Sequence, residues 1–75
     1  TERRARLCID VAGAHALGQD DAATVTLLLE AERHAFEVVR HSVLAREFVR
    51  VCLGRERRSR TPGLRGLAGR LGVLD

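Results

Sequence analysis

Apolar residues recur with the period of an α-helix from residue 2 to residue 17. Leu7, Val11 and Ala14 fall on one stripe of that helix, whereas the charged residues lie largely off it, which are Arg3, Arg6 and Asp10. Apolar stripes of helices face the core of a folded domain, so we expect this stripe to be buried. It is widened by Cys8, Ala12 and His15.

A second helix is predicted over residues 21–35. The segment before it, from Gly18 to Asp21, supplies a helix stop, a turn and an acidic N-cap. A turn this short joins two antiparallel helices into an αα-hairpin. The second helix is apolar over more than half of its circumference and therefore needs neighbours on two sides. Its apolar residues form two rows, one of Ala23, Leu27 and Ala31 and one of Val25, Leu28 and Leu29.

A third helix is predicted over residues 42–53. The pattern blurs between residues 36 and 41, which indicates a short turn or a helical restart, and Ser42 is a suitable N-cap. Arg46, Glu47 and Arg50 share one face of this helix, and Gly54 ends it. The other face is apolar and carries Leu44, Phe48, Val51 and Cys52.

A short fourth helix is expected within residues 62–75. Thr61 is its predicted N-cap and Pro62 its first helical residue. Glycine recurs at every third position from Gly63 to Gly72, and each interior glycine costs about 1 kcal/mol relative to alanine. We therefore expect this helix to form only when it docks on the rest of the chain. Its docking face would hold Leu64, Leu67, Ala68 and Leu71.

These elements predict an all-α fold, in which a helical hairpin is followed by a third helix and a short C-terminal helix. Residues 1–54 form the helical region, residues 55–61 a basic linker and residues 62–75 a capping helix. A chain of 75 residues buries little more apolar surface than it needs to offset its conformational entropy. We therefore expect a neighbouring domain or a second copy to complete the fold.

The charge pattern offers one alternative function. All 13 basic residues are arginine and the formal net charge is +3, which would attract phosphate groups. A small basic helical DNA-binding module is therefore an alternative, but the basic residues are spread over every element and no aromatic residues interleave with them for base stacking. The contacts of this alternative would be Arg55, Arg57, Arg58 and Arg60.

Catalytic motifs do not emerge from the sequence. It has no Gly-x-Ser-x-Gly, no phosphate-binding loop and no glycine-rich dinucleotide turn, so we expect neither an enzyme nor a cofactor. Cys8 and Cys52 lack metal-ligand spacing and are expected to be small buried side chains, with a single disulfide left open. Cys8 and His15 lie seven residues apart and therefore share a helix face, which could hold part of a metal site. We favour the alternative that both side chains pack inside the hairpin. No apolar run approaches the ~20 residues of a membrane span, so we expect a cytoplasmic protein.

The hairpin can be aligned with the tetratricopeptide pattern, which interlocks large and small residues of two helices over about 34 residues. Val11, Ala12 and Ala31 fit that pattern well. The remaining positions are Cys8 for its Trp, His15 for its Tyr, Thr24 for its second small residue, Leu28 for its Phe and Phe36 for its closing Pro. Phe36 in place of Pro leaves open a continuous join between the second and third helices.

A longer run, from Leu7 to Arg50, closely resembles the C-terminal helical region of actinobacterial helix-turn-helix regulators of the xenobiotic-response-element type. In such regulators an N-terminal DNA-binding domain is followed by degenerate tetratricopeptide-like repeats. The resemblance rests on a Pro-initiated last helix and on four phrases, which are Asp10-Val11-Ala12, Leu29-Glu30-Ala31-Glu32-Arg33, Val39-Arg40-His41 and Leu71-Gly72-Val73.

The resemblance implies a regulatory, non-catalytic domain. It would act by dimerisation, or by contacts coupled to a peptide or small-molecule effector, on a DNA-binding domain outside this chain. Its partners would be other repeats of a longer chain and a second copy, with no membrane contact. A tetratricopeptide-like first helix would present a partner groove lined by Ile9, Gly13, Ala16 and Leu17. A symmetric dimer surface would be formed by Leu27, Leu28 and Leu29.

Overall fold

The computed structural model describes residues 1–56 and 61–73 and contains four helices. They are α1 (Glu2–Leu17), α2 (Asp21–Arg40), α3 (Val43–Arg55) and α4 (Leu64–Arg70). No strand occurs within these two ranges, so the all-α fold is confirmed.

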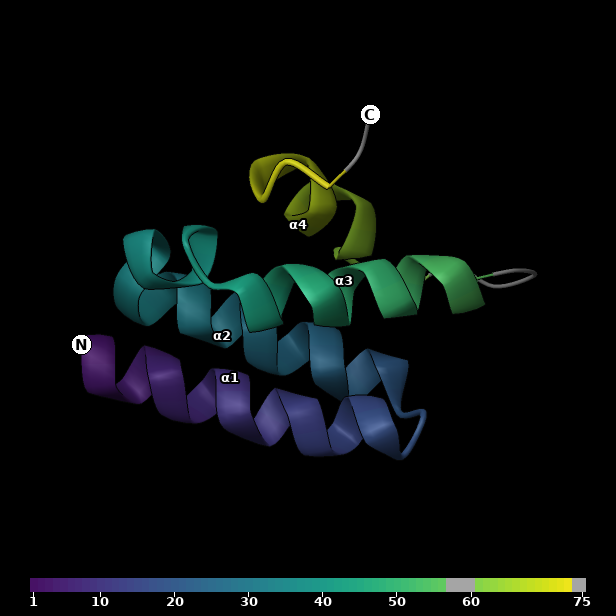
Figure 1. The fold of residues 1–75 in the computed structure, drawn as a ribbon, viewed down its shortest axis with the longest axis horizontal. Helices are drawn as coiled ribbons and strands as arrows, with labels where there is room; N and C mark the ends of the chain where they lie inside the picture. The colour runs from purple at the N-terminus through teal and green to yellow at the C-terminus, as the bar shows by residue number, and fades with distance from the viewer. Residues whose placement is uncertain (57–60, 74–75) are drawn as a thin grey trace.

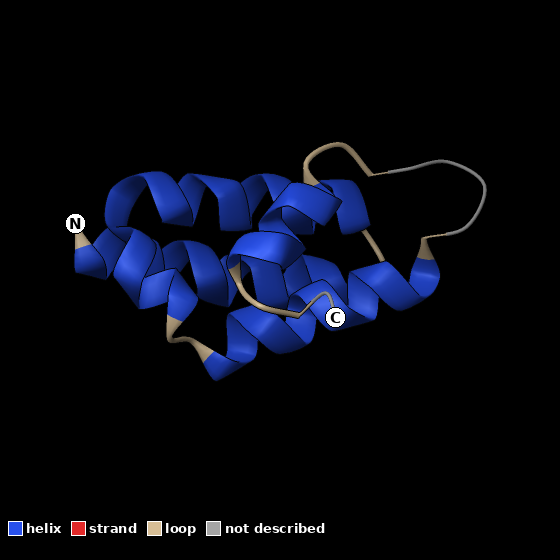
Figure 2. Cartoon of the chain, turned by 90° about the horizontal axis from the view of Figure 1, so that it is seen from above, coloured by secondary structure: helices blue, strands red, loops and turns tan. Residues whose placement is uncertain are grey.

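The helices are stacked in layers (Figure 1). α1 and α2 form the hairpin and make the largest contact of the fold, and α3 packs against both of them. α4 lies on the far side of α3 from α1 and contacts α2 and α3 (Figures 1 and 2). Three longer helices thus form a bundle, and the short α4 covers one of its grooves.

Each of the first three helices begins at a side-chain cap. The Thr1 hydroxyl accepts a hydrogen bond from the Arg4 N–H at 3.3 Å, and the Asp20 carboxylate accepts one from the Ala23 N–H at 3.2 Å. The predicted cap Ser42 accepts one from the Ala45 N–H at 3.1 Å. These caps satisfy N–H groups that have no partner within the helix, and they explain why the starts of α1, α2 and α3 lie within a residue of their predicted positions.

The region after residue 35 agrees with the predicted helical restart. Ala35 leaves the helical conformation, with φ −160° and ψ 87°, which interrupts the helix where it was expected to end. A second helical stretch follows this kink and continues to Arg40 within the same element, α2. The join to α3 is not continuous, because the chain turns at His41 before the Ser42 cap.

The start of α4 differs from the prediction. Pro62 is not helical, and Gly63 precedes the first helical residue with φ +81°. A Cβ atom at Gly63 would lie 2.9 Å from Leu29 Cδ1, so only glycine combines this left-handed backbone with close contact to α2. The apolar face of α4 was predicted correctly, since it is fully or almost fully buried. It consists of Leu64, Leu67, Ala68 and Leu71.

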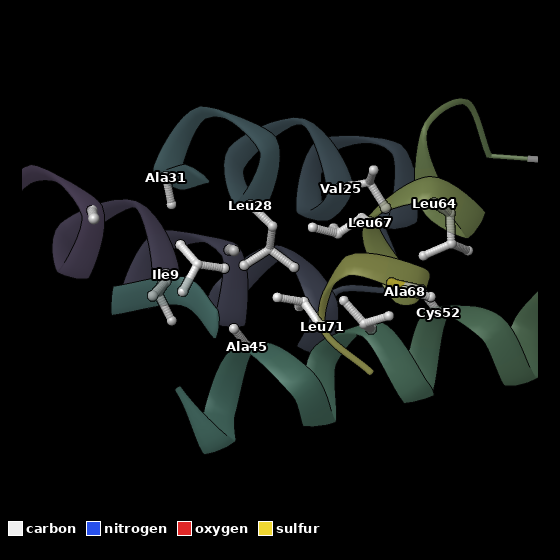
Figure 3. Close-up of a cluster of buried hydrophobic side chains, with 14 residues drawn as sticks. Ile9, Val25, Leu28, Ala31, Ala45, Cys52, Leu64, Leu67, Ala68 and Leu71 are labelled. Carbon is white, nitrogen blue, oxygen red and sulfur yellow. The ribbon is translucent and has the colours of Figure 1, made fainter. Parts of the chain in front are cut away.

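The core is built from all four helices (Figure 3). Leu64 and Leu67 of α4 and its C-cap residue Leu71 extend into the space between α2 and α3, beside Leu28 and Cys52 (Figure 3). These contacts support the expectation that a glycine-rich helix of seven residues depends on docking.

The buried face of α1 is opposite to the centre of the predicted stripe. Leu7, Val11 and Ala14 are exposed, and the buried residues are Ala5, Ile9, Ala12 and Ala16. Of the residues that were expected to widen the stripe, Ala12 is buried as predicted, and Cys8 and His15 are partly buried. The physical reason is that α1 is apolar on two sides, and the side rich in alanine lets neighbouring helices approach its backbone. The Thr24 hydroxyl, for example, lies 3.5 Å from the Ala12 carbonyl oxygen across the hairpin.

The predicted face of α3 is wrong in part for the same reason. Cys52 is buried and Phe48 partly buried, as expected, but Leu44 and Val51 are exposed. Ala45 and Val49 are buried in their place. Smaller side chains again face the neighbouring helices, and two of the larger ones face solvent.

Candidate functional site

The predicted partner groove on α1 is filled by the chain itself. Ile9 and Ala16 are buried, and Gly13 lies under Phe48 of α3. A Cβ atom at Gly13 would lie 2.8 Å from Phe48 Cζ, so α3 leaves no room for a partner at this position. Leu17 is 89% exposed at the helix end, but the other three residues belong to the core or its edge, so the prediction is wrong.

The predicted dimer surface on α2 is also wrong. Leu28 is fully buried, and Leu27 and Leu29 are partly buried against the core. The two neighbours that this helix was expected to need are supplied within the chain, because α1 and α3 pack against α2 and α4 lies over Leu29. No room remains at Leu28 for a second copy.

One apolar surface that remains exposed is the outer face of α1, defined here as Leu7, Val11 and Ala14. Leu7 is 60% exposed and Val11 41% exposed, and Ala14 is exposed as well. The spacing of four and three residues keeps them in one row along the helix, directly opposite the buried face. Single exposed apolar side chains are common on proteins, whereas a row of them on one helix is a candidate contact surface.

Charged residues lie at both ends of this row. Arg3 and Arg4 are exposed at its N-terminal end, and neither forms an ion pair within residues 1–56 and 61–73. Asp20 lies beyond its C-terminal end and keeps its carboxylate 57% exposed while it caps α2. The row is therefore flanked by positive charge at its N-terminal end and by negative charge beyond its C-terminal end, and the exposed Asp10 lies beside it between Leu7 and Ala14.

The sequence contains a pattern that could have predicted this exposed row, but the prediction considered only one apolar stripe on this helix. Ala5, Ala12 and Ala16 recur at helical spacing on one side of α1, while larger side chains lie on the other side. When a helix has a small-residue face and a large-residue face, the small one permits the closer packing. The larger apolar side chains are then left to face solvent or a partner.

Further apolar side chains are exposed on α3, which are Val43, Leu44 and Val51. Val43 and Leu44 begin the helix, and Val51 lies two turns beyond Leu44. Phe48 lies between Leu44 and Val51 and is partly covered by Gly13. The row on α3 is therefore interrupted by a contact within the chain, unlike the outer face of α1.

Arg55 of the predicted basic cluster is engaged within the fold. Its guanidinium lies 3.0 Å from the Asp21 carboxylate and donates a hydrogen bond of 3.0 Å to the Ala16 carbonyl. The side chain is only 28% exposed and ties the end of α3 to the turn between α1 and α2. Arg55 is therefore not a free phosphate contact, which corrects that prediction. Arg57, Arg58 and Arg60 lie outside the described residues.

Both cysteines are free thiols in the structure, which answers the open question of a disulfide. Cys52 is buried, and its thiol donates a weak hydrogen bond of 3.6 Å to the Asp21 carboxylate. Burial and the negative charge of Asp21 raise the pKa of the Cys52 thiol to about 11, although Arg55 acts in the opposite direction. The thiol therefore stays protonated near neutral pH and is a poor nucleophile.

Comparisons of the chain with protein-family models, with curated proteins and with solved structures found no match. Among the helices of residues 1–56 and 61–73, none has the length and the hydrophobicity to cross a membrane. The same part of the chain brings no three His, Cys, Asp or Glu side chains together as a metal site.

Proposed function

We propose that this chain is a non-catalytic interaction domain of a bacterial transcription regulator, and that it joins two copies of the regulator through the outer face of α1. The observation that carries this proposal is the exposed row of Leu7, Val11 and Ala14 opposite the buried face of the same helix. Burying Leu7 and Val11 against a partner would gain on the order of 1 to 2 kcal/mol for each side chain.

Charge favours a second copy in antiparallel orientation. A two-fold axis near Val11 would bring Arg3 and Arg4 of one copy toward Asp20 of the other. Parallel helices would instead place the arginines of both copies side by side. An antiparallel pair therefore brings unlike charges together, and its contact uses the same surface on both copies, as closed dimers do.

The regulatory role follows from the resemblance to helix-turn-helix regulators. Such DNA-binding domains commonly act as dimers on two-fold related half-sites, so a domain that joins two copies raises their affinity for DNA. A tetratricopeptide-like reading of the α1–α2 hairpin is supported by its small and large positions. Ala12, Thr24, Leu28 and Ala31 are all fully buried there.

Sedimentation equilibrium over a range of protein concentrations tests the proposal. The natural chain is expected to change from monomer to dimer as its concentration rises, and Leu7→Ser combined with Val11→Ser is expected to weaken dimerisation at least tenfold. Leu44→Ser together with Val51→Ser is the matched control, because it removes two exposed apolar side chains from α3.

The control is expected to leave the dimer intact, and circular dichroism should report the same helix content for all three proteins. A natural chain that stays monomeric at millimolar concentration would contradict self-association. A dimer that is lost with the α3 variant and kept with the α1 variant would place the contact elsewhere.

A further inference from the structure

A second feature lies away from the outer face of α1. A hollow of about 430 Å³ opens where the end of α2, the first turn of α3 and the end of α4 meet. It is lined by Arg40, His41 and Arg46 and by residues 69–72 at the end of α4. Figure 2 shows how the chain leaves α4 on the side of the turn between α2 and α3.

Among the described residues, those that line this hollow include no acidic one. Two other hollows of the structure differ in this respect. One, of about 490 Å³, includes Glu2, Asp10 and Glu37 in its lining. The other, of about 530 Å³, includes Glu30 and Glu32. The hollow at the end of α4 is thus the electropositive one of the three.

Two of the cations that line this hollow lack an ion-pair partner in the described part of the chain. Arg40 and Arg46 lie within 4.0 Å of no carboxylate in the described part of the chain. His41 and Arg70 are already partnered, since His41 lies 3.2 Å from Glu37 and Arg70 donates three hydrogen bonds to the Glu32 carboxylate. The excess of positive charge therefore comes from Arg40 and Arg46.

The partial negative charge of the helix ends at this site offsets only part of that positive charge. α2 and α4 both end here, and each C-terminus carries the equivalent of about half a negative charge. Two unpaired guanidinium groups exceed this by roughly one positive charge. Arg40 lies in the last turn of α2, where a cation interacts favourably with the helix dipole, so its position needs no further explanation. Arg46 lies near the start of α3, where a cation is unfavourable for its own helix. An anion bound beside Arg46 would offset this unfavourable interaction.

We propose that this hollow binds a phosphate group between Arg40 and Arg46. The planar guanidinium group offers paired N–H donors that match the oxygens of phosphate, and such charge-assisted hydrogen bonds are stronger than neutral ones. The phosphate belongs either to a small phosphorylated ligand or to the backbone of a nucleic acid. The site does not depend on self-association, because it lies on α2, α3 and α4.

Titration with inorganic phosphate at constant ionic strength, followed through the backbone amide NMR signals of Gly69 and Gly72, tests the site. Saturable shifts of these two signals are expected. Arg40→Gln is expected to weaken binding about tenfold, and Arg46→Gln should do the same. Arg40 is exposed, so its replacement is not expected to disturb folding.

Arg6→Gln is the matched control, because it makes the same change in net charge at an exposed arginine of α1 that has no part in either proposed contact, and it is expected to leave binding unchanged. Shifts that do not saturate, or that respond equally to Arg6→Gln and Arg40→Gln, would overturn the proposal. They would show attraction by net charge alone.

A duplex DNA titration of the same proteins distinguishes the two sources of phosphate. If the group belongs to nucleic acid, the duplex binds, and Arg40→Gln lowers the dependence of log K on log salt by about one. If the group belongs to a small ligand, inorganic phosphate binds at the hollow and the duplex does not displace it. Failure of both phosphate and duplex to bind there would overturn the proposal.

Discussion

At the scale of single residues, burial decides chemistry that the sequence leaves open. Cys8 and Cys52 are equivalent in composition, yet Cys52 lies in the core beside Asp21, and Cys8 is only partly buried. The expectation of small buried side chains therefore holds fully for Cys52 and in part for Cys8. Spacing along the chain could not indicate Asp21 as a neighbour, because 31 positions separate it from Cys52.

The raised pKa of Cys52 predicts how stability depends on pH. Its value in the fold, about 11, lies above the ordinary value of 9.0, so below pH 9 the thiol is protonated in both states and its contribution is complete. As the pH rises from about 9 to 11, the unfolded state loses its proton first and the fold loses stability. The loss from this thiol is expected to be on the order of 2 kcal/mol.

Urea unfolding at about pH 8 and about pH 10.5 measures this loss, with Cys52→Ala as the control that lacks the group. The variant is less stable throughout because it loses a buried sulfur, but its stability should fall less between the two pH values. Equal pH dependence in the two proteins would show that Cys52 does not titrate as described.

At the scale of elements, the positions of the helices were easier to predict than their buried faces. N-cap residues and turns are local signals, and they located α1, α2 and α3 closely. The choice between Leu7 and Ile9 as the inward side of α1 depends on how closely α2 and α3 approach, which no local pattern contains. The candidate site was missed for this reason, since its residues were assigned to the core.

Two glycines of the α4 region should respond in opposite directions to alanine. Gly69→Ala is expected to stabilise the fold by about 0.5 to 1 kcal/mol, since a Cβ atom there meets nothing within 4 Å and alanine favours the helix. Gly63→Ala is expected to destabilise it by about 1 to 2 kcal/mol, because φ is +81° and Leu29 lies 2.9 Å from the added atom.

Thermal unfolding of the two variants beside the natural chain checks this pair of predictions. A change of 1 kcal/mol corresponds to a shift of roughly 4–8 °C for a domain of this size. If Gly63→Ala left the melting temperature unchanged, α4 would not be held by the tight turn at Gly63. If Gly69→Ala had no effect on the melting temperature, the low helix propensity of the glycines in α4 would not limit the docking of this helix.

At the scale of the whole molecule, the chain covers the apolar groove between α2 and α3 itself but leaves an apolar row on α1 exposed. α4 fills the groove between α2 and α3, whereas nothing in the described chain covers the outer face of α1. The sequence-based expectation of a partner stays a prediction. Its predicted surface moves from α2 to α1, because the chain supplies its own neighbours for Leu28.

The antiparallel contact predicts which side chains meet across the two-fold axis. A residue near that axis lies close to its own copy, so Val11→Cys is expected to form a disulfide between two chains, with Cys8→Ala preventing competing bonds. Leu44→Cys in the same background is the control, because residue 44 is more exposed than residue 11, at 56% against 41%, but lies on α3. Cys52 is buried and protonated, so it can be left in place.

Non-reducing electrophoresis after mild oxidation of these two variants tests whether two copies meet through the outer face of α1. Val11→Cys is expected to give mostly covalent dimer at concentrations where Leu44→Cys stays mostly monomer. Adding Leu7→Ser should reduce the yield from Val11→Cys. Equal and low yields from both variants would contradict a dimer joined through the outer face of α1.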